Sequence, residues 1–219
     1  MRKILLSALF FTMVLLNSAN AFSAEKILSD FEKDDGGWGV PDWCFEKGDY
    51  VCKTSSISAD VSNTGTSSLK LLVDFPGNAW KAGIAEYESD GSGLEEYGTI
   101  SCSFYIPKTA PSGIKAKLIL TVEDGSEWLW VETMNTIDLT PSEWTVLAAS
   151  IKSGSRDWMR PLGSVISGGS PNDPKVSGAQ VYDVKDGFRA NIRKIGVRVE
   201  SDKTGYAGPV YIDTIKVSE

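Results

Sequence analysis

The chain is predicted to fold as an all-β sandwich, and three observations support this. Almost every apolar run is short, alternates with polar residues and is followed by turn residues. Helical periodicity is weak along the whole chain. In addition, Asp124-Gly125 separates two alternating apolar runs, which is the strongest short-range signal for a β-hairpin.

Short alternating segments are expected to form the strands of this sandwich. They are Lys26 to Phe31, Ser67 to Phe75, Trp80 to Tyr87, Thr99 to Ile106, Lys115 to Glu123, Glu127 to Thr133, Trp144 to Ile151, Lys194 to Glu200 and Val210 to Val217. The stretch from Ser153 to Gly187 is rich in glycine, proline and asparagine and is expected to be irregular. Irregular segments of this length in a compact domain are usually functional or mobile loops.

The hairpin register follows if Glu123 pairs with Ser126 across the Asp-Gly turn. One face then carries Leu120 opposite Leu129 and Leu118 opposite Val131, which suits a core. The other face pairs Thr121 with Trp128, Ile119 with Trp130 and Lys117 with Glu132. Two tryptophans in line beside a charge pair suit a planar ligand rich in hydroxyls, such as a sugar.

The alternative is that this second face is buried under another sheet or a long loop, with both tryptophans in the core. The charged pair of Lys117 and Glu132 instead indicates that at least one end of this face contacts water, because charged residues are rarely fully buried. Trp80, which opens another strand, extends the candidate sugar platform. Trp43 and Trp158 are expected on loops, where they either rim a cleft or plug the sandwich ends. Trp144 is assigned to the core, and Trp38 to the core or a strand cap.

The first residues predict export. Arg2 and Lys3 precede an apolar run from Ile4 to Leu16, and Ala19-Asn20-Ala21 has the small-x-small pattern of a cleavage site. We therefore expect a secretory signal peptide over residues 1–21, with residue 24 as the latest cleavage point, and a secreted or periplasmic protein. The apolar run is short for a bilayer and no later stretch approaches that length, so membrane insertion is not expected. The remaining residues, 25–219, suit one sandwich domain.

The net charge of the chain and the positions of its cysteines predict which macromolecules it avoids and how its thiols are used. The whole chain has a formal net charge of -7, so nucleic acid is disfavoured, because its phosphates would be repelled. Export makes an oxidising compartment plausible, and Cys44 and Cys52 flank a short segment that a disulfide would staple. Cys102 alternates with apolar residues and is expected to be a buried free thiol.

Several segments together resemble carbohydrate-binding modules of the galactose-binding-like jelly-roll type. Their order matches over nearly the whole mature chain: Leu28 to Glu32 with Gly37-Trp38, Asn63 to Leu71, Leu139 to Val146, and Gly208 to Val217. The resemblance implies a jelly roll of two antiparallel sheets and a polysaccharide or oligosaccharide ligand. Such modules usually accompany a catalytic domain, and this chain shows none, so it either acts alone on a glycan or uses the fold differently.

The resemblance also implies one structural calcium ion. Glu32 and Asp213 match the carboxylate ligands of that pattern, and backbone carbonyls around Thr64 to Ser67 would complete it. Hard oxygen ligands from distant strands suit calcium. The alternative is that both acids are solvated strand ends.

Catalysis is disfavoured by composition. The chain contains no histidine, which removes the common general base and zinc ligand. A glycosidase would need two carboxylates, and Glu123, Asp124, Glu127 and Glu132 are close in sequence but poorly oriented. A polysaccharide lyase would use tyrosine with a basic residue, and Tyr105, Tyr182, Arg189 and Arg198 have no distinctive spacing. A third alternative is a structural or interaction protein of the cell envelope built on the same scaffold.

Overall fold

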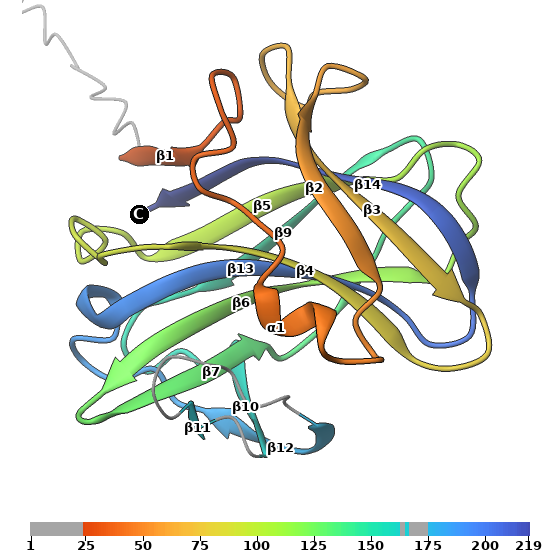
Figure 1. Ribbon diagram of the computed structural model, residues 1–219. Helices are drawn as coiled ribbons and strands as arrows, with labels where there is room; N and C mark the ends of the chain where they lie inside the picture. Colours follow the sequence, from red (N-terminus) through yellow and green to blue (C-terminus); the bar gives the residue numbers. More distant parts are fainter. Residues whose placement is uncertain (1–23, 163–164, 167–174) are drawn as a thin grey trace, which may run out of the picture.

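The computed structural model describes residues 24–162, 165–166 and 175–219, which form two antiparallel β-sheets packed face to face (Figure 1). The predicted signal peptide lies outside the described residues. The amide of Glu219 donates to the carbonyl of Ala24 at 3.2 Å, so the two ends of the described chain are adjacent. Within the described part of the chain, no helix is both long and apolar enough to cross a membrane.

The smaller sheet contains six strands. Its spatial order is β2 (Cys52–Ser58), β3 (Ser68–Pro76), β14 (Gly205–Ser218), β5 (Thr99–Tyr105) and β9 (Trp144–Ser150), and β1 (Glu25–Ser29) also pairs with β14.

The larger sheet contains eight strands. Its order is β12 (Lys175–Tyr182), β10 (Trp158–Leu162), β7 (Glu127–Thr133), β6 (Ile114–Asp124), β13 (Ile192–Ser201) and β4 (Lys81–Glu88), with β11 (Val165–Ile166) on β7 and β8 (Ile137–Asp138) on β6. Two short helices complete the fold: α1 (Asp42–Phe45) and the 3₁₀ helix η1 (Arg189–Asn191).

The core lies between the two sheets, where alternate residues of each strand point inward. Leu69, Leu71 and Val73 of β3 belong to the same buried cluster as Leu118 and Leu120 of β6, and each is at most 3 % exposed. The chain passes from one sheet to the other between β3 and β4, between β4 and β5, and again between β5 and β6. The predicted all-β jelly-roll sandwich is confirmed.

Several short elements were not predicted. The region from Ser153 to Gly187 contains β10, β11 and β12, so the expectation of an irregular stretch is wrong for these strands, whereas residues 153–157 and 183–187 lie outside any strand, as expected. The strand β2 was missed because its sequence, Cys52 to Ser58, is mostly polar. Both β2 and β12 are edge strands of their sheets. Edge strands pair along one side only and need no continuous apolar face, so the alternation signal is weak there.

Residues 39–51, here called the cover segment, cross the outer face of the larger sheet (Figure 1). Both ends of the segment are tied to β4. Gly39 exchanges two backbone hydrogen bonds of 3.0 Å with Glu86, and the amide of Val51 donates to the carbonyl of Ala82 at 2.7 Å. The helix α1 lies between these ties, and its Trp43 and Cys44 are buried against the sheet. The cover segment therefore shields the middle of this face from solvent.

Candidate functional site

The outer face of the larger sheet, here called the aromatic face, gathers most of the residues predicted to bind a ligand. Its members come from β4, β6, β7 and β13 together with the cover segment: Trp43, Tyr50, Trp80, Ile84, Lys117, Ile119, Trp128, Trp130, Glu132 and Arg198. Trp130, Glu132 and Lys117 lie close together on it, as the sequence predicts.

The hairpin of β6 and β7 has the predicted faces but another register. Its two-residue loop is Gly125-Ser126, so Asp124 pairs with Glu127, and the expected pair of Glu123 with Ser126 is wrong. Gly125 has a φ of 70°, whereas Asp124 and Ser126 keep ordinary φ values. This is the pattern of a type II′ turn, with glycine at the first central position. Each residue's partner therefore shifts by two positions, and a shift of two leaves every side chain on its predicted face.

Trp130 is fully buried, so the expectation that this face is open is wrong at its centre. The ring of Trp43 packs edge-on against Trp130, with ring centroids 5.8 Å apart and an interplanar angle of 75°. Trp130 has 0 % of its surface exposed. The shielding group is the cover segment, so the alternative of a face buried under a loop is correct for Trp130.

A buried charge cluster lies beside Trp130. Glu132 accepts hydrogen bonds from Trp130 Nε1 at 3.0 Å and from Lys117 Nζ at 3.4 Å, and it also pairs with Arg198. Arg198 Nε lies 2.8 Å from Glu200 Oε2. The two cations and two carboxylates make the cluster neutral. Burial lowers the pKa of the Lys117 ammonium, an effect that the charge of Glu132 opposes.

The pair of Lys117 and Glu132 was expected to keep one end of the face wet. In the structure Lys117 is 4 % exposed and Glu132 is 0 % exposed, so that expectation is wrong. The physical reason is the larger cluster: the Arg198 guanidinium also pairs with Glu132, and Glu200 balances the charge of Arg198. Charged groups are buried at tolerable free energy when they are paired and hydrogen-bonded in this way.

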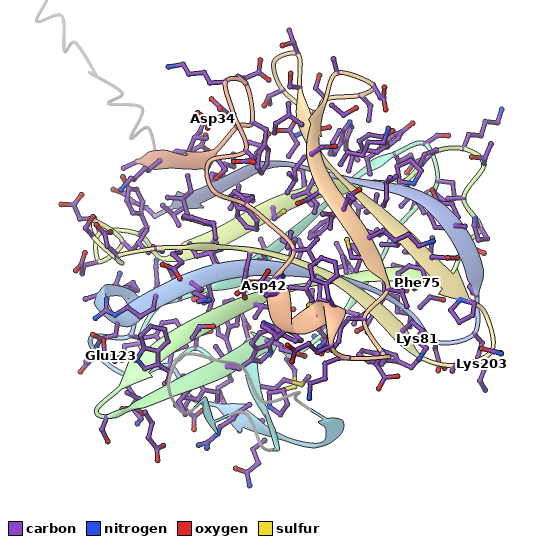
Figure 2. All side chains as sticks on the ribbon, in the orientation of Figure 1. Asp34, Asp42, Phe75, Lys81, Glu123 and Lys203 are labelled. Atoms are coloured by element: carbon purple, nitrogen blue, oxygen red, sulfur yellow. The ribbon has the colours of Figure 1, made fainter. Side chains whose placement is uncertain are left out.

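Trp80 and Trp128 are the two tryptophans of the aromatic face that remain partly accessible. Trp80 packs against Tyr50, with ring centroids 6.2 Å apart, and the Arg198 guanidinium lies 5.6 Å from its ring centre. Trp80 precedes Lys81 at one end of the face, and Trp128 pairs with Glu123 at the other end. Figure 2 shows Lys81 and Glu123 on opposite sides of the molecule. The two accessible rings therefore lie at opposite ends of the face, with the cover segment between them.

Trp158 and Trp144 do not lie where the sequence predicts them. Trp158 belongs to β10 and points into the main core, where its Nε1 donates to the carbonyl of Ser150 at 2.8 Å. It is fully buried and cannot rim a cleft. Trp144 is partly exposed on the outer face of the smaller sheet, with its ring centre 5.3 Å from that of Tyr105, so its assignment to the core is wrong. Trp38 is buried in the core, as expected.

The predicted disulfide is absent: no bond joins the sulfurs of Cys44 and Cys52, and both residues are buried. Cys44 packs on the outer face of the larger sheet beside Ala82, whereas Cys52 belongs to the main core near Gly83. Ala82 and Gly83 are successive residues of β4, so their Cβ positions lie on opposite faces of the sheet. The strand therefore separates the two thiols. Cys102 is fully buried, as predicted.

Glu32 and Asp213 hold the same turn from two sides. Glu32 accepts hydrogen bonds from the amides of Thr66 and Ser67, both at 2.9 Å. Asp213 Oδ2 accepts from the amides of Asn63 at 2.7 Å and Thr64 at 3.1 Å. Hydrogen bonds from Thr66 lower the pKa of Glu32, whereas burial raises that of Asp213.

In chemical type, two carboxylates meeting at one turn from distant strands fit a hard cation. In arrangement, however, N–H groups of the turn face both carboxylates, and a calcium ion would require carbonyl oxygens there. No cluster of three or more histidine, cysteine, aspartate or glutamate side chains suited to a metal occurs among the described residues. Calcium binding at Glu32 and Asp213 stays a prediction.

Several residues proposed for the enzymatic alternatives are held in ion pairs, are buried or lie on different sheets. Glu123 is paired with Arg193 at 2.7 Å and Asp124 with Lys185 at 2.6 Å, both on the surface, whereas Glu132 is buried. Arg198 lies on the larger sheet, and Tyr105 lies on the smaller one.

Sequence reasoning missed the role of Arg198, Tyr50 and Trp43 in the aromatic face. A signal for Arg198 exists: in the strand from Lys194 to Glu200 it alternates with Val197 and Val199, which point to the core. That parity places Arg198 on the outer face. No comparable signal exists for Trp43 or Tyr50, because an irregular segment has no periodicity.

Comparisons with known proteins agree with this fold. A scan against protein-family models finds no match, and a search of curated protein sequences finds none either. Among solved structures, the chain is similar to CBM27-1 of Caldicellulosiruptor saccharolyticus in complex with mannohexaose, with a TM-score of 0.51 and 17 % identity over 89 % of this chain and 96 % of that one.

Two further solved structures are comparably similar. A family 11 carbohydrate-binding module from Clostridium thermocellum, in complex with a β-1,3-1,4-mixed-linked tetrasaccharide, has a TM-score of 0.52 and 16 % identity over 88 % of this chain and 94 % of its own. CBM28, described as specific for non-crystalline cellulose, has a TM-score of 0.52 and 14 % identity over 86 % and 92 %. The predicted resemblance in fold to carbohydrate-binding modules is confirmed.

Proposed function

We propose that this chain is an exported, non-catalytic protein that binds a polysaccharide or oligosaccharide on the aromatic face. One observation carries the proposal: five aromatic residues gather on one sheet face around a neutral charge cluster, namely Trp43, Tyr50, Trp80, Trp128 and Trp130. Sugars present flat apolar faces that stack on such rings, and their hydroxyls need polar partners nearby. The fold likeness to glycan-binding modules supports the proposal by analogy.

Within this face, the sugar contacts Trp80 and Trp128, because they are the partly accessible tryptophans. Trp130, Glu132 and Lys117 form the rigid floor beneath the cover segment and do not touch the ligand. Export rests on the predicted signal peptide, and the absence of histidine from the chain supports a binder over an enzyme.

A second candidate is a structural or interaction protein of the envelope on the same scaffold. The burial of Trp130 favours it, because a face closed by its own chain offers less surface to a sugar than an open platform. The two candidates differ in whether any glycan binds.

The test is a glycan array followed by calorimetric titration of the purified protein and its Trp80→Ala and Trp128→Ala variants. Losing one stacked ring is expected to weaken binding by about 1–3 kcal/mol, or roughly tenfold to hundredfold, by analogy with base stacking. Val146→Ala is the matched control, because Val146 is 59 % exposed on the other sheet. A wild-type protein that binds no glycan overturns the proposal in favour of the interaction protein.

A further inference from the structure

Phe45 is an exposed aromatic residue on a helix that is otherwise anchored. The two preceding residues of α1, Trp43 and Cys44, are buried against the larger sheet. Phe45 instead has 63 % of its surface exposed. Because its ring is largely in water, Phe45 gains little of the stability that burying a phenylalanine side chain gives. The burial of Trp43 and Cys44 fixes the backbone of α1, and so the place of Phe45 on the surface.

A hollow lies beside the Phe45 ring. It has a volume of about 380 Å³ and is lined by Phe45, Tyr50, Val51, Cys52, Lys53 and Asp74. These residues come from α1, the end of the cover segment, β2 and β3, so the hollow spans the side of the sandwich. Its volume falls within the range of about 300–1,000 Å³ that is typical of small-molecule sites.

The wall of the hollow carries one ion pair and no surplus charge. Lys53 Nζ lies 2.7 Å from Asp74 Oδ2, and the two side chains are 64 % and 48 % exposed. Because the two charges of the pair cancel, neither an anionic nor a cationic ligand gains a net electrostatic attraction there. A wholly apolar ligand would cover the pair without replacing its lost water. Burial raises the pKa of the Cys52 thiol to about 12, so Cys52 is no nucleophile here.

An uncharged ligand with one flat apolar face and several hydroxyls satisfies all of these constraints. We propose that this hollow, here called the Phe45 pocket, binds one pyranose ring of a neutral glycan. The sugar ring stacks on Phe45, and its hydroxyls donate to Asp74 and accept from Lys53. The inference rests on the proposed function, and it adds a subsite that the aromatic face alone does not contain.

The Phe45 pocket adjoins the Trp80 end of the aromatic face. Tyr50 lines the pocket and also packs against Trp80, with ring centroids 6.2 Å apart. A glycan that contacts Trp80 therefore passes next to the pocket, whereas Trp128 lies at the far end of the face. The pocket is accordingly the end subsite of the chain bound at Trp80.

The test uses the purified protein and a panel of neutral hexasaccharides, namely mannohexaose, cellohexaose and xylohexaose. The best binder is titrated calorimetrically into wild type, Phe45→Ala, Phe45→Tyr and the exposed control Val146→Ala. Phe45→Ala is expected to weaken binding about tenfold or more, whereas Phe45→Tyr keeps a stacking ring and binds nearly as wild type. Because Phe45 is largely exposed, the melting temperature of each variant should stay near that of wild type. The amide resonances of Val51 and Lys53 should also shift on titration.

The outcomes separate the pocket from the proposed function. If a hexasaccharide binds wild type, and Phe45→Ala binds equally well with no shift at Val51 or Lys53, the pocket is wrong and the proposed function stands. If Phe45→Ala weakens binding while Trp80→Ala and Trp128→Ala do not, the pocket stands and the aromatic face is the wrong site. If no hexasaccharide in the panel and no glycan on the array binds wild type, both proposals fail together.

Discussion

Arg198 of β13 and Glu132 of β7 form a fully buried ion pair across the central strand β6. Each has 0 % of its side chain exposed, and the Arg198 guanidinium reaches past Lys117 to bond the Glu132 carboxylate. The same carboxylate accepts from Lys117 and from Trp130 Nε1. Glu132 therefore pairs with two cations and also accepts a hydrogen bond from the buried tryptophan of the aromatic face.

The first prediction concerns Glu132. Glu132→Gln should destabilise the protein by about 3–5 kcal/mol, because Lys117 would lose its buried carboxylate partner and Arg198 would keep only Glu200. Urea unfolding measures the change. The control is Glu123→Gln on β6, which breaks a surface pair with Arg193 and should cost at most about 1 kcal/mol. Equal losses in the two variants would contradict the central role of Glu132.

The second prediction concerns Trp130. Trp130→Ala should lower the free energy of unfolding by about 3–5 kcal/mol, because it removes a fully buried ring from beneath Trp43. Trp128→Ala at the partly exposed end should destabilise the protein much less. Thermal and urea unfolding of the two variants, compared side by side, check this. A Trp130→Ala protein as stable as wild type would show that the cover segment does not pack on Trp130 in solution.

The third prediction concerns calcium. If Glu32 and Asp213 bind calcium in the folded state only, saturating calcium should raise the melting temperature and a chelator should lower it by mass action. The shift should vanish in Asp213→Asn. If neither calcium nor the chelator changes the melting temperature, the turn is held without metal. The hydrogen bonds that hold it come from Asn63, Thr64, Thr66 and Ser67.

The fourth prediction concerns acid stability at Asp60. Hydrogen bonds from Lys70, Ser58 and Tyr211 lower the pKa of Asp60 to about 2. Because the folded pKa lies below the unfolded value, this contribution to stability is present above about pH 4 and is lost as the pH falls toward 2. Asp60→Asn should therefore melt below wild type at pH 7, and the difference should shrink on acidification. A difference in melting temperature between wild type and Asp60→Asn that stays the same at every pH would refute this prediction.

The fifth prediction concerns the cysteines. Burial raises the pKa of Cys52 to about 12 and that of Cys102 well above its ordinary value. Neither thiolate forms near pH 8, so iodoacetamide should label the native protein slowly. After denaturation without reductant, Cys44 and both of these residues should be labelled. If only Cys102 is labelled, Cys44 and Cys52 are joined by the disulfide that the sequence predicts.

The alternation of apolar and polar residues predicted the strands correctly where a strand packs on the core. The segment from Glu127 to Thr133 was predicted with its observed limits, and its alternation placed Leu129 and Val131 inward. Even with the wrong hairpin register the faces were right, because side chains in a strand repeat every two residues. The position of the turn was predicted wrongly. Asp124-Gly125 favours a type I′ loop, whereas the chain forms a type II′ loop at Gly125-Ser126.

The sequence by itself determined the sandwich and which hairpin side chains share the aromatic face, namely Lys117, Ile119, Trp128, Trp130 and Glu132, because alternation along a strand is a local property. Only the tertiary structure decided which of those side chains meet solvent. The cover segment is held to β4 by backbone hydrogen bonds that leave no periodic trace in the sequence. It buries Trp130 while leaving Trp80 and Phe45 accessible. Likewise, the burial of Lys117 and Glu132 depends on Arg198 from a distant strand, since charge compensation acts through space and carries no signature in sequence order.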